Sequence, residues 1–423
     1  MKPHYLLIVL FTGFYLTTRP QPADTITLEQ CYHQAVENFP LAKQRAMLQQ
    51  SAGLEIKKLN TQYLPQVALH AQASYQSDVP HVPIESPAFE IPVVPKDQYR
   101  ATIDVSQVIY DGSATKHQKD IQSSAVMVQQ QNVEVQLEQL KSQAGALFFS
   151  ILLADAQLEI NKLLRDNLFN QLEKVQAAVD NGIMISSNAD VLRAELIKAR
   201  QQQETISRSR RAAIAMLAEL TGLQLDTADI FRIPELNYSP GMDISASPEY
   251  TLFQLQQQTL DLQRHAIISK QLPRLAAFAQ GGFGRPGFNL LEPDLKPLYI
   301  AGLKLIWSPW HWNAGRYERQ ILSINKDIIT SQREAFDVNS RLALMKQSAT
   351  IETLQRQLAS DMEIIALRQR ITSAAAAQLD NGVITATDYL IELNAEQQAR
   401  LNLKMHGIQL EQAKAEYLLI IGK

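Results

Sequence analysis

The sequence predicts a mostly α-helical fold that is built twice, each copy containing a helix, two β-strands and a hairpin of long helices. One observation is a near-repeat, because Asp-Asn-Gly-Ile at 180–183 returns as Asp-Asn-Gly-Val at 380–383, and Gly222 returns as Gly422. The same interval separates both pairs, which indicates a duplicated unit. The other observation is composition, since only 16 of 423 residues are glycine and long stretches are rich in Gln, Ala, Leu and Glu.

The N-terminal segment, 1–22, is typical of a secretory signal peptide, because Lys2 precedes a short apolar run and a polar stretch follows. We therefore expect the mature protein to be exported. No later stretch contains the roughly 18 to 20 apolar residues of a membrane-spanning helix. If the chain enters a membrane, it must do so as β-structure. The single cysteine, Cys31, cannot form an intramolecular disulfide, and we expect it to be buried on a helix.

Helices are predicted in the same order in both halves of the chain. A first repeat at 23–222 and a second at 247–423 flank a linker at 223–246. In the longest helix, apolar residues such as Val133, Leu137 and Leu140 follow the 3.5-residue period of a coiled coil. The predicted helices are 27–60, 112–180 and 186–220 in the first repeat, and 248–271, 313–379 and 385–420 in the second, so that coiled-coil hairpins cover 112–220 and 313–420.

Segments of alternating polarity lie between the helices and predict β-strands. Tyr99, Ala101 and Ile103, for example, alternate with polar residues. Alternation over about ten residues is typical of transmembrane strands, although a soluble half-buried hairpin has the same pattern. The predicted strands are 63–77 and 98–110 in the first repeat, and 273–284 and 298–309 in the second.

Two features favour a membrane environment for these strands. All three tryptophans, Trp307, Trp310 and Trp312, lie where the last strand ends, as an interfacial aromatic girdle would. The connections 78–97 and 285–297 are long and rich in proline. Four strands cannot close a barrel, and an open edge in lipid leaves backbone groups unpaired. We therefore expect oligomerisation, with three copies closing a 12-stranded β-barrel that continues into an α-helical coiled-coil tunnel.

The ordered set of local motifs resembles the TolC family of outer-membrane efflux channels, the outer membrane factors, from about Thr27 to Gly422. The segment 27–31, Thr-Leu-Glu-Gln-Cys, resembles the family's opening helix, 107–112 its strand-to-helix crossing, and 190–195 its returning helix. The resemblance implies a homotrimer with a barrel in outer-membrane lipid and a helical tunnel in the periplasm. It also implies two partners, a periplasmic adaptor (membrane fusion protein) and an inner-membrane transporter, whose substrates the trimer exports passively.

The resemblance also implies where the adaptor is contacted, because the helix turns carry this role in such channels. Glycine is in addition the ordinary residue for a left-handed turn between helices, and the two roles are compatible. The matching residues are Asn181, Gly182 and Ile183 in the first repeat, and Asn381, Gly382 and Val383 in the second.

Family channels narrow at the periplasmic end with acidic residues, and Asp190 and Asp388 are the matching candidates for this aperture. A ring of carboxylates would attract cations. A carboxylate in the first turn of a helix also interacts favourably with the helix dipole, so capping is the alternative role. The family pattern is incomplete, because Ile391 stands where a second acidic residue would follow one turn later.

No pattern in the sequence predicts an enzyme, a metal site or a cofactor. The eight histidines are scattered, without a pair at helical ligand spacing or a His/Cys cluster, and nothing pairs a nucleophile with a base. The net charge of −3 and the absence of a long basic run give no indication of a nucleic-acid partner. The alternative function is a periplasmic coiled-coil structural or adaptor protein with a soluble hairpin domain. Drugs, metal ions and secreted proteins all remain open as cargo of the channel.

Overall fold

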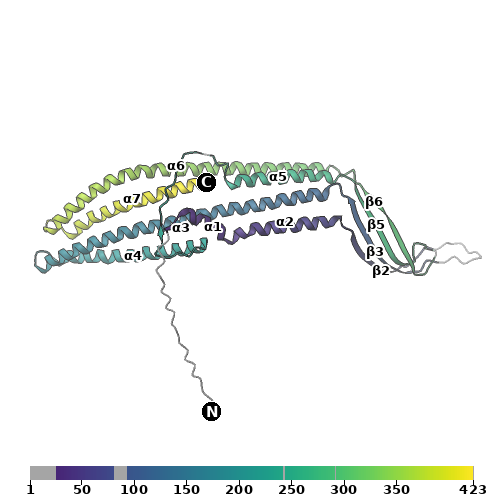
Figure 1. The fold of residues 1–423 in the computed structure, drawn as a ribbon, viewed down its shortest axis with the longest axis horizontal. Coiled ribbons are helices and arrows are strands. Elements are labelled where there is room, and N and C mark those ends of the chain that lie inside the picture. The colour runs from purple at the N-terminus through teal and green to yellow at the C-terminus, as the bar shows by residue number, and fades with distance from the viewer. Residues whose placement is uncertain (1–24, 81–92, 242, 291, 423) are drawn as a thin grey trace, which may run out of the picture. The chain divides into compact units, whose positions relative to one another are not determined.

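The computed structural model describes residues 25–80, 93–241, 243–290 and 292–422 (Figure 1). The predicted signal peptide, 1–22, lies outside these residues. The described chain forms two compact units. The first unit takes its described residues from Met1–Ala35, Gln143–Asn237 and Glu352–Gln412, and the second from Val36–Ser142, Tyr238–Ile351 and Ala413–Lys423. Each unit therefore combines segments from both halves of the sequence and does not follow the boundaries of the predicted repeats.

Helices make up most of the described chain. The single helix predicted at 27–60 is wrong, because a 3-10 helix at Pro40–Lys43 divides it. Pro40 has no N–H to donate, and it holds Phe39 in an extended conformation with φ −64° and ψ 136°, which an α-helix cannot continue. The helices are α1 (Leu28–Asn38), α2 (Gln44–Asn60), α3 (Ala114–Asp180), α4 (Ser186–Thr221), α5 (Pro248–Ser269), α6 (Ala314–Asp380) and α7 (Ala386–Ile420).

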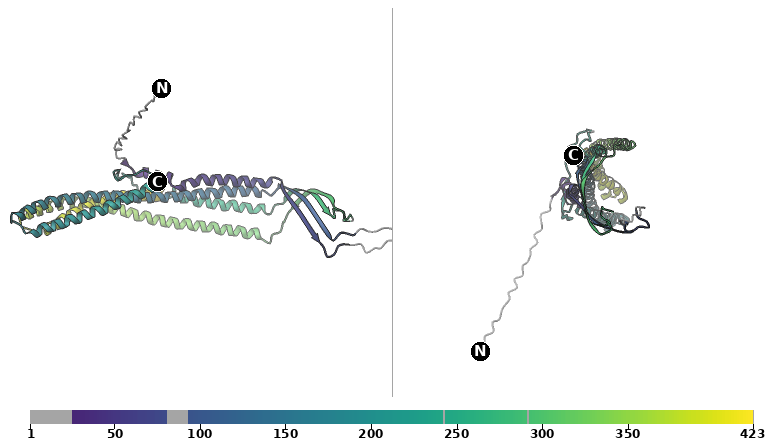
Figure 2. Two further views of the ribbon diagram at one scale, coloured as in Figure 1. Left: turned by 90° about the horizontal axis from the view of Figure 1, so that it is seen from below. Right: turned by 90° about the vertical axis from the view of Figure 1, so that its right-hand side faces the viewer.

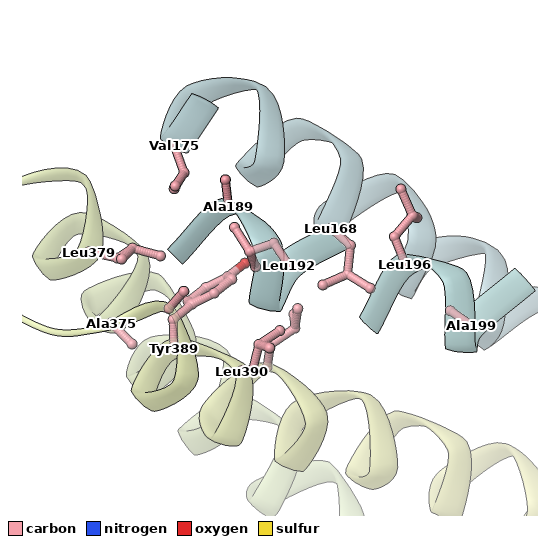
Figure 3. Packing of buried hydrophobic residues seen from close by; sticks show 12 residues of the cluster. Leu168, Val175, Ala189, Leu192, Leu196, Ala199, Ala375, Leu379, Tyr389 and Leu390 are labelled. Atoms are coloured by element: carbon pink, nitrogen blue, oxygen red, sulfur yellow. The ribbon is translucent and has the colours of Figure 1, made fainter. Parts of the chain in front are cut away.

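The core of the first unit is a seam between two helical hairpins, α3 with α4 and α6 with α7 (Figure 3). Ala189, Leu192 and Leu196 follow coiled-coil spacing along α4 and are buried. Tyr389 of α7 lies in the same cluster and is 4% exposed, and this burial raises the pKa of its phenol to about 12. The small alanines allow the helices to approach closely, while the leucines fill the space between them.

A second part of this unit surrounds α1. Cys31 on α1 is fully buried, as expected, and burial raises the pKa of its thiol to about 12. Before α1, the two-residue strand β1 (Thr25–Ile26) pairs in parallel with β4 (Ile230–Phe231). Phe231 packs edge to face on Phe148 of α3, with ring centroids 5.6 Å apart. These contacts hold the start of the described chain against the long helices.

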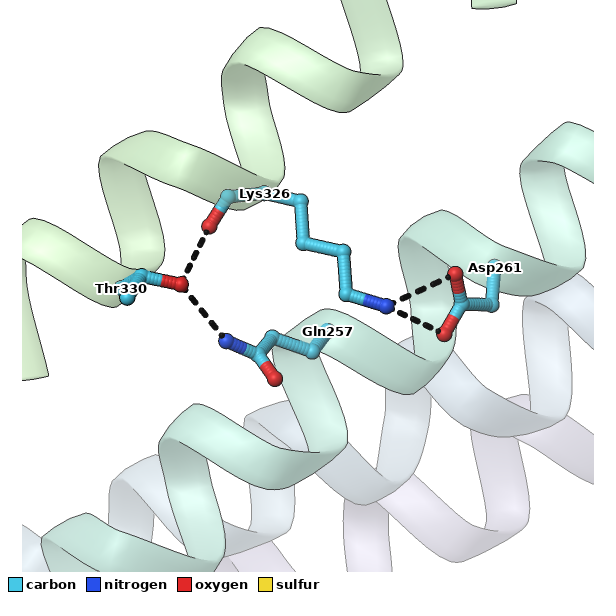
Figure 4. Close-up of polar contacts among 4 residues, drawn as sticks. All are labelled: Gln257, Asp261, Lys326 and Thr330. Atoms are coloured by element: carbon cyan, nitrogen blue, oxygen red, sulfur yellow. Dashed lines mark hydrogen bonds and ion pairs between the residues drawn. The ribbon is translucent and has the colours of Figure 1, made fainter.

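In the second unit, polar side chains join α5 to α6 (Figure 4). Lys326 Nζ lies 2.9 Å and 3.1 Å from the two carboxylate oxygens of Asp261. Gln257 Nε2 donates to Thr330 Oγ1 at 3.2 Å. The Thr330 hydroxyl in turn donates to the Lys326 carbonyl at 3.0 Å. These contacts lie one helical turn apart on each helix, so they set the register between α5 and α6.

The second unit also contains a four-stranded antiparallel sheet, in the order β2-β3-β5-β6 (Figure 2). The predicted strand at 63–77 begins later than expected, because Thr61–Tyr63 forms a 3-10 helix. Gly282 of β5 permits the close approach of β3, since a Cβ there would lie 2.0 Å from the Ala101 carbonyl oxygen. The strands are β2 (Gln66–Tyr75), β3 (Asp97–Tyr110), β5 (Arg274–Arg285) and β6 (Lys296–Ile306).

The seam in the first unit predicts the effect of truncating one of its leucines. Leu192→Ala removes a side chain that is 0% exposed, and we expect it to lower the free energy of unfolding by about 2–5 kcal/mol. Ile197→Ala on the same helix is the matched control, because Ile197 is 51% exposed, and it should cost less than about 1 kcal/mol. Guanidinium unfolding followed by circular dichroism measures both. Equal effects of the two variants would contradict the seam.

Candidate functional site: helix turns and an exposed sheet face

The turn between α3 and α4 is a Schellman motif centred on Gly182, whose φ is +73°. The Gly182 N–H donates to the Val179 carbonyl at 3.0 Å, and the Ile183 N–H donates to the Ala178 carbonyl at 2.8 Å. The Asn181 side chain donates at 2.7 Å to the carbonyl four residues earlier. These bonds satisfy carbonyls that the end of a helix would otherwise leave free.

The turn between α6 and α7 repeats this geometry at Gly382, whose φ is +72°. The Gly382 N–H donates to the Leu379 carbonyl and the Val383 N–H to the Gln378 carbonyl, both at 2.9 Å. The Asn381 side chain again donates at 2.7 Å to the carbonyl four residues earlier. The two Asp-Asn-Gly sequences therefore fold into the same backbone motif.

Both turns expose an apolar side chain directly after the glycine. Ile183 is 74% exposed and Val383 is 72% exposed. In a Schellman motif this residue frequently packs on the last turn of its own helix, but here its apolar surface faces solvent. Gly182 and Gly382 also have open space where a Cβ would stand, so the backbone conformation and not crowding requires glycine. The two turns thus present the same small apolar surface.

Asp388 forms a capping box with Thr385 at the start of α7. The Thr385 N–H and hydroxyl donate to Asp388 Oδ2 at 3.0 Å and 2.7 Å, and the Asp388 N–H donates to the Thr385 hydroxyl at 3.2 Å. The hydrogen bond from the Thr385 hydroxyl, followed by that from its N–H, lowers the pKa of the Asp388 carboxyl. The Thr-x-x-Asp spacing is a sequence signal that could have identified this cap.

Asp190 has different surroundings, although it follows the equivalent turn. Its carboxylate lies 2.8 Å from Arg193 on the same helix, and Arg193 also donates to Gln176 of α3 at 3.2 Å. The residue before α4 is Ile185, whose side chain cannot cap a helix. The two candidate aperture carboxylates therefore do not share one role in the fold of a single chain.

The exposed face of α7 continues beyond Asp388 with a residue that carries no charge. Ile391 is 61% exposed, and Asn394 and Gln398 continue the same exposed stripe. Glu392 lies off this stripe, since its carboxylate accepts a hydrogen bond from Arg368 of α6 at 3.0 Å. A second carboxylate is therefore absent from this stretch of the stripe.

The two turns are tied to each other by residues that sequence reasoning did not identify. Asn188 of α4 accepts a hydrogen bond from the Ala386 N–H of α7 at 3.0 Å, and so caps a helix of the other hairpin. Asp380 of α6 accepts from Gln171 and Lys174 of α3 at 2.7 Å and 3.1 Å. No local signal could have revealed these contacts, because their partners are about two hundred residues apart in the chain.

In the second unit, one face of the four-stranded sheet is largely apolar and largely exposed, with Gln107 and the Asp97–Arg285 ion pair as its polar positions. The register pairs apolar positions on neighbouring strands, for example Leu69 with Ile103. The exposed fraction is 75% for Leu69, 86% for Tyr299 and 67% for Leu303. Continuous apolar surface of this kind marks contact with a membrane or another protein. Its members are Val67, Leu69, Ala71, Ala73, Tyr99, Ala101, Ile103, Val105, Leu275, Ala277, Ala279, Phe283, Tyr299, Ala301, Leu303 and Leu305.

The opposite face of the sheet is polar in the first half of the chain. Asp104 lies 2.6 Å from His70 and accepts a hydrogen bond from Gln280 at 2.7 Å, which links three strands. In the second half the expected polar face is only partly polar, because Phe278 and Ile300 share it. Phe278 packs over Gly302 of the next strand, whose missing side chain leaves room for the ring.

The three tryptophans follow β6 directly and are all exposed, by 58%, 71% and 81% for Trp307, Trp310 and Trp312. Trp310 and Trp312 pack edge to face, with ring centroids 5.6 Å apart. The Trp307 indole N–H donates to the Gln271 carbonyl at 3.1 Å. The structure therefore brings these residues together at one end of the sheet.

Neither a metal centre nor a membrane-spanning helix is found where the chain is described. No three His, Cys, Asp or Glu side chains among these residues are placed to hold a metal ion. Every described helix is too short or too polar to cross a membrane.

No protein-family model and no curated protein matches the chain by sequence. Solved structures match it in fold. The CmeC outer membrane channel of Campylobacter jejuni aligns with a TM-score of 0.68 at 14% identity, over 99% of this chain and 94% of its own. The outer membrane protein VceC of Vibrio cholerae aligns with a TM-score of 0.68 at 11% identity, over 93% and 96%. The MtrE outer membrane channel of Neisseria gonorrhoeae aligns with a TM-score of 0.66 at 12% identity, over 93% and 88%.

These structures cover nearly the whole chain, and none is a partial match to one unit. Their identities are too low to carry residue roles, so they bear on the arrangement of helices and strands. The mostly helical fold with a four-stranded sheet that the sequence predicts is therefore the fold of outer-membrane channel proteins.

Proposed function

We propose that this chain is the subunit of a trimeric outer-membrane channel that passively exports substrates delivered by an inner-membrane pump through a periplasmic adaptor. The observation that carries the proposal is the exposed apolar face of the sheet. Sixteen apolar positions on four strands share this face, and burying that much apolar surface in water-free surroundings is strongly favourable at about 25 cal/mol per Å². Lipid provides such surroundings along the whole sheet.

The edges of the sheet support closure by further copies. β2 and β6 are the outer strands, and each pairs with only one neighbour in the described chain. The strands alternate in direction across the sheet, so β6 of one copy can pair antiparallel with β2 of the next. Lipid contains no water to satisfy an open edge. Three copies give the 12-stranded barrel expected from the sequence, and the polar face with Asp104 then lines its interior.

The helices next to these edge strands also leave apolar surface uncovered. On α6, Tyr317, Ile321, Ile324 and Ile328 follow alternate spacings of four and three and are 49–58% exposed. This coiled-coil seam continues along the helix through Ser331, Ala335, Val338, Leu342, Met345 and Ala349, which are all exposed.

α2 is the natural partner for this seam. It has no buried residue in the single chain, and Met47 and Leu54, one heptad apart, are 62% and 59% exposed. Because α2 precedes β2 and α6 follows β6, the contact between edge strands of two copies would bring these helices together. The same neighbour then covers the sheet edge and the helical seam.

The two Schellman turns are proposed as the adaptor contacts. Their exposed apolar residues, Ile183 and Val383, have no packing partner to lose on docking, and their rigid backbone is set before binding. Asp388 is proposed to line the aperture, because its carboxylate is exposed and ionised even while it caps α7. Asp190 is a weaker candidate, since Arg193 neutralises it.

The first experiment tests the trimer and its helical seam together. We expect light scattering of the detergent-extracted protein, corrected for bound detergent, to give three chain masses. Val338→Asp places a charge in the α6 seam and should reduce the mass to one chain, because a buried unpaired carboxylate is costly. Asn339→Asp adds the same charge one residue away and should leave the trimer intact.

A trimer that survives Val338→Asp would show that the seam is not the subunit contact. A wild-type monomer that stays in solution without detergent would overturn the channel and favour the periplasmic structural or adaptor protein.

The second experiment tests the turns. The double variant Ile183→Asp with Val383→Asp should reduce the amount of periplasmic adaptor that co-purifies with the channel by about tenfold or more, because central apolar contacts contribute about 2 kcal/mol. The control is Ile197→Asp, which charges another exposed apolar position of the same hairpin. Co-purification from cross-linked cells is quantified by mass spectrometry. Undiminished co-purification of the adaptor would show that the turns are not its docking site.

The third experiment separates the charge of Asp388 from its cap. Asp388→Asn should lower the cation preference of single channels in planar bilayers, whereas Thr385→Ala, which weakens the cap and keeps the charge, should not. Because the folded pKa of Asp388 is lowered, the cation preference should persist at neutral pH and disappear as the pH falls through that lowered pKa. Unchanged selectivity of Asp388→Asn would assign the residue to capping alone.

A further inference from the structure

The chain crosses from strand to long helix twice, and the two crossings share an unusual backbone. Each has two successive residues in the left-handed region. In the first crossing these are Gly112 and Ser113, with φ of 68° and 64°, and in the second Trp312 and Asn313, with φ of 47° and 63°. The duplication thus supplies an internal comparison, in which one backbone carries two different sets of side chains.

The first crossing is closed by its own residues. Asp111 is 9% exposed and accepts hydrogen bonds from the Thr115 N–H at 2.8 Å and the Tyr63 hydroxyl at 3.1 Å. Lys119 lies over the Tyr63 ring, 5.9 Å from its centre. Gly112 packs so tightly that a Cβ would lie 2.8 Å from Leu272. The polar groups of the first crossing therefore have their hydrogen-bond partners within the chain.

In the second crossing the equivalent side chains are exposed to solvent. Trp312 takes the position of Gly112 and is 81% exposed, although the left-handed region is strained for a bulky residue. Glycine would have avoided this strain. Trp310 is 71% exposed and packs edge to face on Trp312. Both rings bury little surface in the single chain, so they are accessible to another molecule.

Two arginine side chains lie beside the tryptophans. A cavity of about 240 Å³ is lined by Trp310, Trp312, Arg316, Arg319 and Gln271, among others. Arg316 and Arg319 occupy the positions of Lys116 and Lys119 in the first crossing. Neither arginine has an ion-pair partner among the described residues, whereas the neighbouring Glu318 is paired with Lys270 at 2.9 Å. The cavity therefore combines exposed indole rings with two uncompensated guanidinium groups.

We propose that this cavity binds the headgroup of an anionic phospholipid. Guanidinium groups bind phosphate oxygens in a bidentate manner, and indole rings settle at the boundary between lipid tails and headgroups. The site follows β6, where the apolar face of the sheet ends with Leu305, so a lipid packed along that face places its phosphate at this level. The inference rests on the proposed membrane location and adds a lipid preference to it.

The tryptophans supply the measurement, because the chain contains only these three and all lie between 307 and 312. The full-length protein is reconstituted in phosphatidylcholine bilayers that contain either brominated phosphatidylglycerol or brominated phosphatidylcholine at equal mole fraction. We expect phosphatidylglycerol to associate at least about tenfold more strongly, judged by quenching, because two basic residues at the surface attract an anionic headgroup. In the double variant Arg316→Gln with Arg319→Gln, both brominated lipids should quench the tryptophan fluorescence equally.

The control is Lys116→Gln with Lys119→Gln, the same loss of charge in the first crossing, which should retain the preference. Equal quenching of the wild type by both lipids, or a preference that survives in the arginine variant, would overturn the lipid site while leaving the channel standing. Loss of the preference on adding inorganic phosphate to the buffer would show that the site takes phosphate from solution and not from lipid. No quenching by either lipid would overturn the membrane location itself.

Discussion

A four-stranded sheet with two open edges and one apolar face is the constraint on which the rest of the structure depends. Neither edge strand, β2 or β6, has a second partner in the described chain, and unpaired backbone groups are costly wherever water is excluded. The helices attached to these strands share the same incompleteness, because α2 buries no residue and α6 exposes a coiled-coil seam. A single chain therefore leaves strand edges and helical surface uncovered, and the proposed trimer would cover both together.

Duplication explains why the chain uses the same backbone motifs twice and why they differ in chemistry. The Schellman turns at Gly182 and Gly382 are nearly identical because their hydrogen bonds are local. The strand-to-helix crossings keep their left-handed residues but exchange a buried Asp111 network for exposed Trp310 and Trp312. Because the backbone is the same in both crossings, the difference in burial comes from their side chains.

Local patterns account for the parts of the fold that could be predicted. Alternation of Tyr99, Ala101 and Ile103 with polar residues follows from the two faces of a strand, and the register later placed these residues on one exposed face. The Asp-Asn-Gly turns could be predicted because glycine alone adopts their left-handed conformation without strain. The helix predicted at 27–60 was wrong because its apolar periodicity outweighed Pro40 in the prediction, whereas in the fold the missing N–H of proline decided the outcome.

The sequence by itself determined the duplicated order of elements, the two turns and the apolar face of each strand, because these depend on residues close together in the chain. Only the tertiary structure decided that Asn188 caps α7, that Asp380 accepts hydrogen bonds from Gln171 and Lys174, and that Gln271 lines one cavity with Trp310 and Trp312. These outcomes depend on which helix lies beside which and on the direction in which each side chain points. That information comes from packing between distant segments, which local periodicity does not contain.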